Sequence, residues 1–170
     1  MNLIRHAADE CWDALAQVSD PEIPVLSVLD LGMIRGVELN TQDEIVVRLT
    51  PTYSGCPATD LLKAEITQAF EAKGLMPVKV VVDLSEAWTT DWMSEAGKQK
   101  LQRYGIAPPK GESHSCGTHV ALTDGIECPR CQSRRTKLLS EFSSTACKAL
   151  YKCQDCLEPF DRSEERRVGK

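Results

Sequence analysis

Apolar positions in the first hundred residues recur alternately with helical and strand spacing. Helical spacing over 3–18 predicts an amphipathic helix with Cys11 packed in its apolar face. Alternation and β-branched content predict three strands, at 30–39, 44–49 and 76–84. Two more helices are expected, at 57–73 and 89–104, each followed by a glycine suited to a left-handed C-cap. The pattern predicts an α/β fold class, with a small α+β sheet of about three strands and packed helices.

Local signals refine these elements. Asp20-Pro21-Glu22 has the form of an N-cap, a first-turn proline and an acid favoured by the helix dipole, so a short helical turn is expected over 25–29. The polar run 40–43 predicts a turn that makes the first two strands a hairpin. Because 76–84 is almost entirely apolar, this strand is expected at the centre of the sheet.

The turn Thr50–Pro57, between the second strand and the next helix, contains a candidate reactive thiol. Gly55 permits unusual backbone angles and Pro57 suits a first helical position, which places Cys56 at or just before a helix N-terminus. Backbone N–H groups and the macrodipole favour an anion there, so the thiol is expected to ionise more easily than a free one. Such a residue is a metal ligand or a nucleophile, or a small buried residue that caps the helix; the residues alone leave this open.

The second half of the chain contains two Cys-x-x-Cys pairs, with 21 residues between the inner cysteines. Two such knuckles can direct four sulfurs to one point and form a tetrahedral metal site. Strands expected at 136–142 and 145–151 form a hairpin that brings the pairs together. The predicted ligands of this four-cysteine zinc-ribbon β module are Cys128, Cys131, Cys153 and Cys156. Zinc is the default ion and an iron–sulfur cluster the alternative. Without a metal, the two cysteine pairs would be interpreted as redox dithiols or disulfides.

Residues 106–126 have no periodicity, so they are interpreted as a linker between a domain at 1–105 and the ribbon at 127–161. The charged segment 162–170 is interpreted as a disordered or foreign tail. Potential secondary ligands are His114, Cys116 and His119 in the linker, and Cys147 in the second ribbon strand. Cys147 is equally well explained as a packing residue.

Composition excludes some classes of function. The net charge is −5, and residues 1–110 contain 16 acidic and 10 basic side chains. The excess of basic residues that is typical of nucleic-acid-binding proteins is therefore missing. The sequence contains no signal-peptide pattern and no run of 18 apolar residues, so no membrane association and a cytoplasmic location are expected. In that compartment eight cysteines indicate metal or thiol chemistry rather than disulfides.

Several motifs together resemble the small α/β family of metal–sulfur cluster assembly factors. They are Asp20-Pro21-Glu22-Ile23, Leu31-Gly32-Met33-Ile34, the Thr50–Pro57 turn, Trp92-Met93-Ser94 and Tyr104-Gly105-Ile106. The C-terminal ribbon narrows the resemblance to accessory proteins of the phenylacetyl-CoA oxygenase (epoxidase) system. The ribbon residues that carry this resemblance are Ser144-Thr145-Ala146-Cys147-Lys148-Ala149-Leu150-Tyr151. The resemblance covers about residues 1–161. The tail departs from it, because that family usually ends with an aromatic residue, a lysine and a further cysteine.

The resemblance implies a non-catalytic accessory protein of phenylacetate catabolism that helps to mature iron or iron–sulfur centres. It maps the reactive cysteine of the family onto Cys56 and the ribbon ligands onto the two Cys-x-x-Cys pairs. Implied partners are oxygenase or epoxidase subunits and iron–sulfur assembly proteins, and a homodimer is compatible with it. The alternatives are a zinc-ribbon binding module without cluster transfer and a thiol enzyme. The enzyme is disfavoured because the sequence places no histidine near Cys56 to act as a base.

Overall fold

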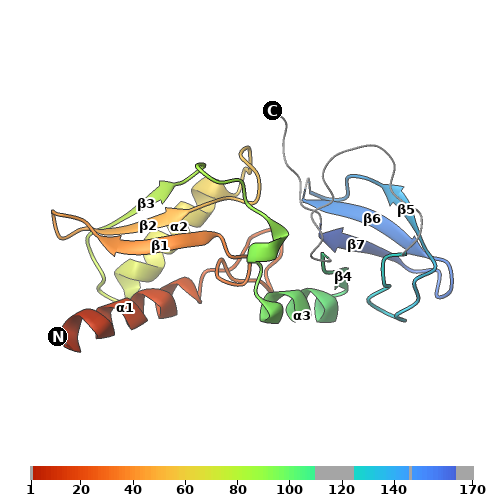
Figure 1. Ribbon diagram of the computed structural model, residues 1–170, viewed down its shortest axis with the longest axis horizontal. Helices are drawn as coiled ribbons and strands as arrows, with labels where there is room; N and C mark the ends of the chain where they lie inside the picture. Colours follow the sequence, from red (N-terminus) through yellow and green to blue (C-terminus); the bar gives the residue numbers. More distant parts are fainter. Residues whose placement is uncertain (1, 110–124, 146, 164–170) are drawn as a thin grey trace. The chain divides into compact units, whose positions relative to one another are not determined.

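The computed structural model describes residues 2–109, 125–145 and 147–163 (Figure 1). The chain divides into two compact units, one up to Gly97 and the other from Lys98. Each unit has its own small sheet, of three strands in the first and four in the second. With helices beside the first sheet, this mixed architecture confirms the predicted fold class. Among the described residues, the helices are too short or too polar to cross a bilayer.

The first sheet combines a hairpin with a helical crossover. Strands β1 (Ile34–Leu39) and β2 (Ile45–Leu49) are antiparallel and joined by the predicted turn, in which the Asn40 side chain accepts hydrogen bonds from the backbone of Gln42 and Glu44. Helix α2 (Thr59–Ala72) then leads to β3 (Val78–Val82), which is parallel to β2. The order β1-β2-β3 puts β2 in the middle, so the prediction of a central 76–84 strand is wrong.

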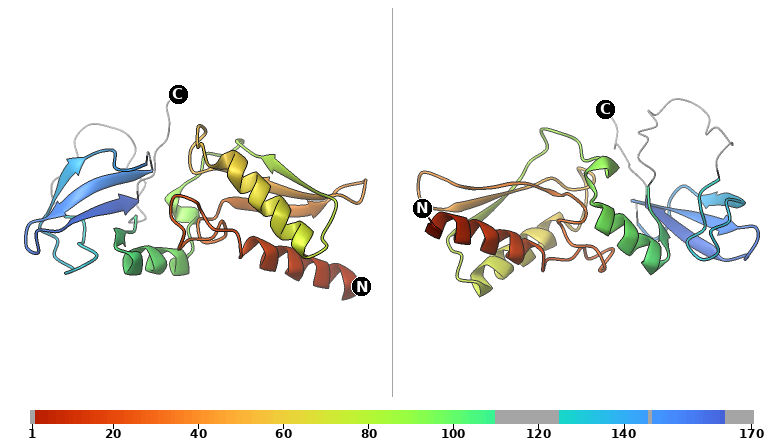
Figure 2. Two further views of the ribbon diagram at one scale, coloured as in Figure 1. Left: turned by 180° about the vertical axis from the view of Figure 1, so that it is seen from behind. Right: turned by 60° about the horizontal axis from the view of Figure 1, so that its bottom comes forward.

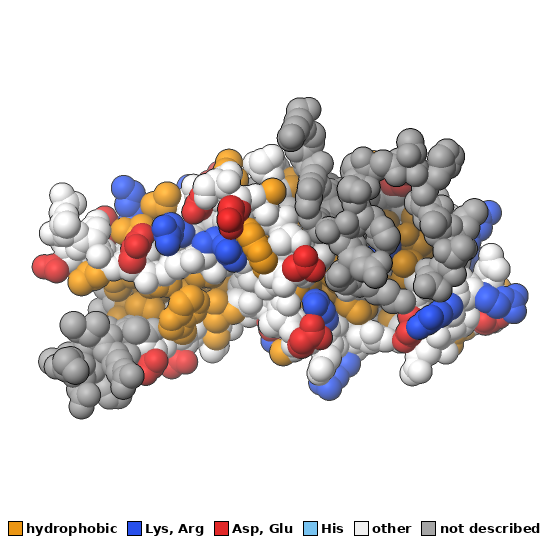
Figure 3. Space-filling model, viewed as in Figure 1, with side chains coloured by type: hydrophobic (Ala, Val, Ile, Leu, Met, Phe, Trp, Pro, Cys, Tyr) orange, Lys and Arg blue, Asp and Glu red, His pale blue; other side chains and the backbone are white. Residues whose placement is uncertain are grey.

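Helices α1 (Asn2–Leu15) and α2 lie on the same side of this sheet (Figure 2). Leu62, Ile66 and Phe70 recur every four residues along α2 and are fully buried. Val47 and Leu49 of the central strand are buried as well. The other face of the sheet displays side chains of both charges (Figure 3). The valines of β3 are half-buried or exposed, so its apolar sequence does not mark a central strand.

The segment between α1 and β1 consists of turns. Asp20 caps it as expected, since its Oδ1 accepts hydrogen bonds from the backbone N–H groups of Glu22 and Ile23 at 2.8 Å. No helix follows at 25–29, and the strand begins at Ile34 rather than at residue 30; both predictions are wrong. The expected helix is absent because Ser27 forms an antiparallel β-bridge with Ser19, and the strand is delayed by a left-handed turn at Gly32, whose φ is +65°.

Two short helices replace the single helix predicted at 89–104. The 3-10 helix η1 (Thr90–Trp92) is capped by the Thr89 side chain, and the extended backbone of Met93 separates it from α3 (Glu95–Tyr104). The Ser94 hydroxyl accepts a hydrogen bond from the Gly97 N–H and donates one to the buried Asp30 carboxylate. This carboxylate therefore ties the start of α3 to the turn segment of the first unit.

The second sheet has the order β4-β7-β6-β5, formed by β4 (Ile106–Ala107), β5 (Thr136–Ser140), β6 (Lys148–Cys153) and β7 (Pro159–Ser163). The β5–β6 hairpin is confirmed, although β6 starts later than predicted. Two strands were not predicted: β4 lies in the expected linker, and β7 extends into the expected tail at Arg162 and Ser163. Ala107, Cys128, Cys153 and Phe160 form the core of this sheet, with Tyr151 stacked on Phe160.

Candidate metal centre and thiol site

Two turns of the same form carry the four cysteines of the second unit. In the first, the Cys128 N–H donates to the Ser133 carbonyl at 2.9 Å, and in the second the Cys153 N–H donates to the Glu158 carbonyl at 3.0 Å. The fourth residue after each leading cysteine has a left-handed backbone, with φ of 63° at Gln132 and 65° at Leu157. These matched knuckles position two sulfurs each, and β5 and β6 bring the knuckles together.

The four sulfur atoms lie within 4.8 Å of one another. The Cys128 and Cys156 sulfurs are 3.8 Å apart, and those of Cys131 and Cys153 are 3.5 Å apart. Metal–sulfur bonds of about 2.3 Å in a tetrahedron would separate the sulfurs by about 3.8 Å. Cys128 and Cys153 are fully buried, whereas Cys131 and Cys156 are exposed, so the cluster lies between the core and the surface. Its geometry is that of a tetrahedral metal site with four cysteine ligands.

Electrostatics in the cluster favour partial ionisation. The backbone N–H of Cys156, assisted by that of Asp155, points at Cys153 and lowers its pKa to about 6 against the effect of burial. The Glu158 N–H acts in the same sense on Cys156, but burial and the three neighbouring thiols raise its pKa to about 12. Four close thiols therefore do not all ionise by themselves, and a soft cation is the ligand that would balance four thiolates.

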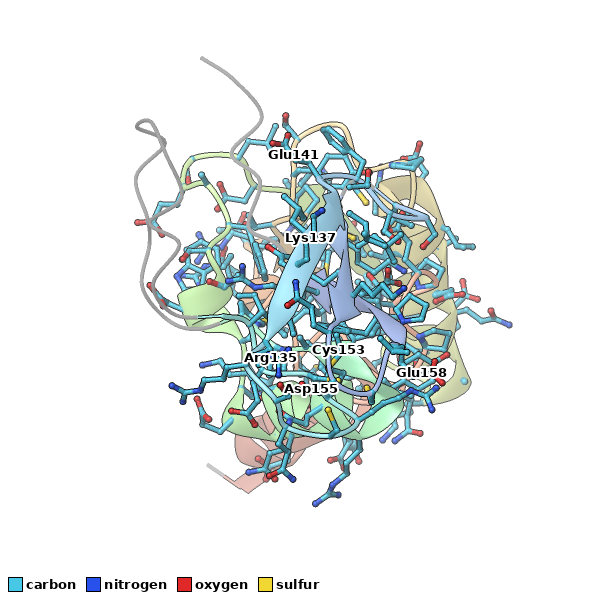
Figure 4. The ribbon with its side chains drawn as sticks, turned by 90° about the vertical axis from the view of Figure 1, so that its right-hand side faces the viewer. Arg135, Lys137, Glu141, Cys153, Asp155 and Glu158 are labelled. Carbon is cyan, nitrogen blue, oxygen red and sulfur yellow. The ribbon has the colours of Figure 1, made fainter. Side chains whose placement is uncertain are left out.

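A salt bridge and a hydrogen bond connect the two knuckles outside the cluster. Asp155, between the cysteines of the second knuckle, lies 2.8 Å from the Arg135 guanidinium and accepts a hydrogen bond from the Ser133 hydroxyl. Figure 4 shows Arg135 and Asp155 together at the knuckle end of β5. The spacing of the cysteines gave no signal for these supporting residues, because the contact depends on how the two turns face each other.

Of the other predicted ligands, Cys147 lies within the described residues, and it is not part of this cluster. Cys147 precedes β6 at the end opposite Cys153, and at about 3.3 Å per strand residue the two lie roughly 20 Å apart. Its sulfur instead lies 3.1 Å from the Thr145 hydroxyl, so it is not placed as a substitute ligand. His114, Cys116 and His119 lie outside the described residues. Among the described cysteines no disulfide is present.

Cys56 lies in the loop that follows the carboxyl end of β2. Its N–H donates to the Tyr53 carbonyl at 3.1 Å, which closes a tight turn. Its own carbonyl accepts hydrogen bonds from the N–H and the hydroxyl of Thr59. Thr59 is the first residue of α2 and Ala58 its N-cap, so the helix begins later than predicted and Cys56 lies before its first turn. The side chain is half-buried.

The expectation that Cys56 ionises easily is wrong. Burial raises the pKa of its thiol, and the negative charges of Glu22 and Asp20 raise it further. Hydrogen bonds with the Ala58 backbone and the Tyr53 side chain oppose this without overcoming it. The macrodipole is weak at this distance from the first helical turn. The sequence had assigned Asp20 and Glu22 to capping alone, and nothing in their spacing indicated that they lie near a cysteine far along the chain.

This arrangement predicts that Cys56 is alkylated slowly near neutral pH. The midpoint of its alkylation rate should lie above that of a free cysteine, and Glu22→Gln should move the midpoint down because one negative charge is removed. The measurement is alkylation by iodoacetamide from pH 6 to 10, with Cys56 followed by peptide mass spectrometry. Glu71→Gln, at an exposed site near the end of α2, is the control and should leave the midpoint unchanged. Equal midpoints in all three proteins would contradict the assignment.

Comparison with known families agrees with both halves of the structure. Residues 8–82 match a model described as an iron-sulfur cluster assembly protein, and residues 112–163 match one described as the PaaD zinc beta ribbon domain. A solved domain of unknown function (DUF59) from Bacillus anthracis covers 57% of this chain and 92% of its own, with 21% identity and a TM-score of 0.53, which supports the fold of the first unit. The class is thus an iron–sulfur assembly fold joined to a metal-binding zinc ribbon.

A full-length relative narrows this class. A protein of Escherichia coli (strain K12), named as the D component of 1,2-phenylacetyl-CoA epoxidase, is 53% identical over 89% of each chain. The chain belongs to the family of these epoxidase D components. A Porphyromonas gingivalis protein named as an Fe-S protein maturation auxiliary factor is 36% identical over 51% of this chain and 83% of its own. The predicted resemblance is therefore confirmed.

Proposed function

We propose that this protein is an accessory factor of a phenylacetyl-CoA epoxidase (oxygenase) system in phenylacetate catabolism, and that it helps to assemble an iron or iron–sulfur centre through Cys56. Membership of the family of epoxidase D components and the similarity of the first unit to Fe-S maturation auxiliary factors support the accessory role. The observation that carries the role of Cys56 is its half-buried thiol in a loop beside two carboxylates.

The chemistry of the Cys56 loop suits transient binding of a cation. Nearby Glu22 and Asp20 make the surroundings electronegative, so the thiol stays protonated in the absence of a cation. An iron ion or cluster approaching as cargo would be attracted by these acids and would displace the thiol proton to solvent water, which leaves a thiolate ligand. Because the same environment restores the proton when the cargo leaves, the site favours release as well as capture.

We assign the ribbon a resident zinc ion held by Cys128, Cys131, Cys153 and Cys156. The closed set of four sulfurs suits a structural site, in which the metal stabilises the fold and presents no open position. An iron–sulfur cluster uses the same ligand type and is the alternative. A colourless protein containing one equivalent of zinc after anaerobic purification would support zinc, whereas charge-transfer absorbance would support the cluster.

We further propose that the protein is not itself a catalyst. A nucleophilic thiol needs a positioned base or a lowered pKa, whereas burial and the negative charges of Glu22 and Asp20 raise the pKa of Cys56. The proposed partners are epoxidase subunits, as clients, and iron–sulfur assembly proteins, as donors of the cargo. A homodimer remains compatible with this role.

The test of this function is Cys56→Ser in a host that lacks its own copy. Serine is nearly the same size and keeps the turn, so the free energy of unfolding should fall by about 1 kcal/mol or less. A soft metal loses its ligand, because serine does not ionise at neutral pH. The variant should therefore fold, fail to support growth on phenylacetate, and leave the client deficient in iron. Cys147→Ser, another partly buried thiol away from the cluster, is the matched control and should support growth.

Full growth with Cys56→Ser would show that the Cys56 turn has only a structural role and does not transfer metal. The remaining candidate would then be a ribbon that binds a partner without cluster transfer, since the four-cysteine cluster is the other chemical feature of the described chain. In that case Cys128→Ser, but not Cys56→Ser, would abolish growth.

A further inference from the structure

Two lysines stand directly opposite each other on the hairpin of the second sheet. Lys137 of β5 and Lys152 of β6 are register partners in the antiparallel pair, and both are exposed. Register partners point to the same face with their Cβ atoms about 5 Å apart, and like charges in this position destabilise a sheet. This arrangement does not help the fold, so another role for the paired charge is indicated.

More cations lie at the same end of the hairpin. Arg134 and Arg130 are exposed, and within the described residues no carboxylate lies at ion-pair distance from either, or from the two lysines. Arg135 differs, since it is neutralised by Asp155 at 2.8 Å. In the first unit, by contrast, Arg35, Arg48 and Lys63 each lie 3.3–3.7 Å from a carboxylate. The knuckle end of β5 thus carries unbalanced positive charge.

The other end of β5 is apolar and exposed. Leu138, Leu139 and Phe142 are 37%, 51% and 56% exposed. An irregularity in the pairing between Leu138 and Ser140 breaks the usual alternation, so that two consecutive leucines face solvent. Within the described part of the chain, β5 is also one of the two edge strands of its sheet. Figure 4 shows the strand with Arg135 at its knuckle end, Lys137 above it and Glu141 at the far end.

We infer that the β5 surface, formed by Arg130, Arg134, Lys137, Lys152, Leu139 and Phe142, docks an acidic segment of a protein partner that also carries apolar side chains. The acidic part would lie over the opposed lysines and the apolar part over Leu139 and Phe142. A combination of arginine, apolar and aromatic side chains is typical of protein interfaces. Charge complementarity sets the register and the rate of association.

A nucleic acid fits this surface less well. The exposed apolar residues have no use in contacts to a phosphate backbone, and Phe142, the exposed aromatic ring of this surface, follows the end of β5 that lies away from the knuckle and its arginines. The inference concerns recognition of a partner and does not depend on the proposed role of Cys56.

The test uses the metal-loaded full chain and a fluorescent synthetic peptide with a glutamate-rich half and a leucine-rich half. Fluorescence anisotropy should detect binding at low salt, weakened by added salt. Lys137→Glu should reduce the affinity roughly tenfold. The same change converts the lysine pair into an opposite-charge pair, so Tm should be unchanged or slightly higher. A loss of binding without a loss of stability is an outcome that a merely structural role would not produce.

Three controls make the result decisive. Lys79→Glu changes an exposed lysine on β3 and should leave the affinity unchanged. A peptide with glutamine in place of glutamate should bind at least tenfold more weakly. Lys152→Glu should repeat the effect of Lys137→Glu and replaces it if that variant loses its metal. The inference is overturned if the peptide does not bind, if the charge reversals or the glutamine peptide change nothing, if Lys79→Glu has an equal effect, or if an oligothymidylate binds more tightly than the peptide.

Discussion

Removal of the metal is expected to unfold the sheet of the second unit while the first sheet stays intact. The core of that sheet is small, and two of its buried residues, Cys128 and Cys153, are also members of the sulfur cluster. A module with so few apolar contacts obtains most of its folding free energy from its metal. Hydrogen exchange followed by mass spectrometry should therefore show lost protection in β5, β6 and β7 after chelation, with β1, β2 and α2 still protected.

Cys128→Ser should reproduce the effect of chelation, because it removes a buried ligand. Cys147→Ser should not, since its sulfur lies at the far end of β6. Unchanged protection in β6 after elemental analysis has verified that the metal is gone would disprove metal-dependent folding. The first unit serves as an internal standard, as its core contains no residue of the cluster.

Gly32→Ala is expected to destabilise the first unit by about 3 kcal/mol or more. An added Cβ would lie 2.2 Å from the Trp92 carbonyl oxygen and 2.7 Å from its carbonyl carbon. These are backbone atoms and cannot rotate away as a side chain can. The residue also has a φ of +65°, which strains any residue with a Cβ. Urea denaturation should show the loss as a lower midpoint with an unchanged slope.

Gly74→Ala separates the two causes. Gly74 has a φ of +71°, but a Cβ there meets nothing within 4 Å. The variant therefore bears only the cost of a left-handed backbone, about 1–2 kcal/mol. The difference between the variants measures the close packing of the Gly32 turn against η1. Equal losses would show that this contact relaxes without cost.

Local chemistry was readable from the sequence. Turn residues, caps and strand alternation gave the β1–β2 hairpin, the capping by Asp20 and the ends of α2 and α3 at Gly74 and Gly105. The paired cysteines indicated a site whose sulfurs the structure brings together, because each knuckle is determined by a few adjacent residues. These features need no knowledge of distant contacts.

Features that depend on distant contacts were missed. The place of β3 at the sheet edge depends on the distant strand with which it pairs, and β4 has too few residues to show a period. The raised pKa of Cys56 arises from burial and from acids more than thirty residues earlier in the chain. The position of Cys56 near a helix N-terminus, considered with its sequence neighbours alone, predicted a lowered pKa instead. The boundaries of the strands also depend on distant contacts, since β7 is recognisable only as the partner of β6.

The pairing of β4 with β7 limits where a recombinant fragment that contains the ribbon can begin. Ile106 and Ala107 join Asp161 and Arg162 across more than fifty residues, and Ala107 belongs to the same buried core as Cys128. The matched ribbon family begins only at residue 112, after this strand. A recombinant ribbon cut at that point would leave an open hydrogen-bonding edge on β7 and an uncovered patch on its core, the combination that promotes edge-to-edge aggregation. A soluble graft into another protein therefore has to begin before Ile106.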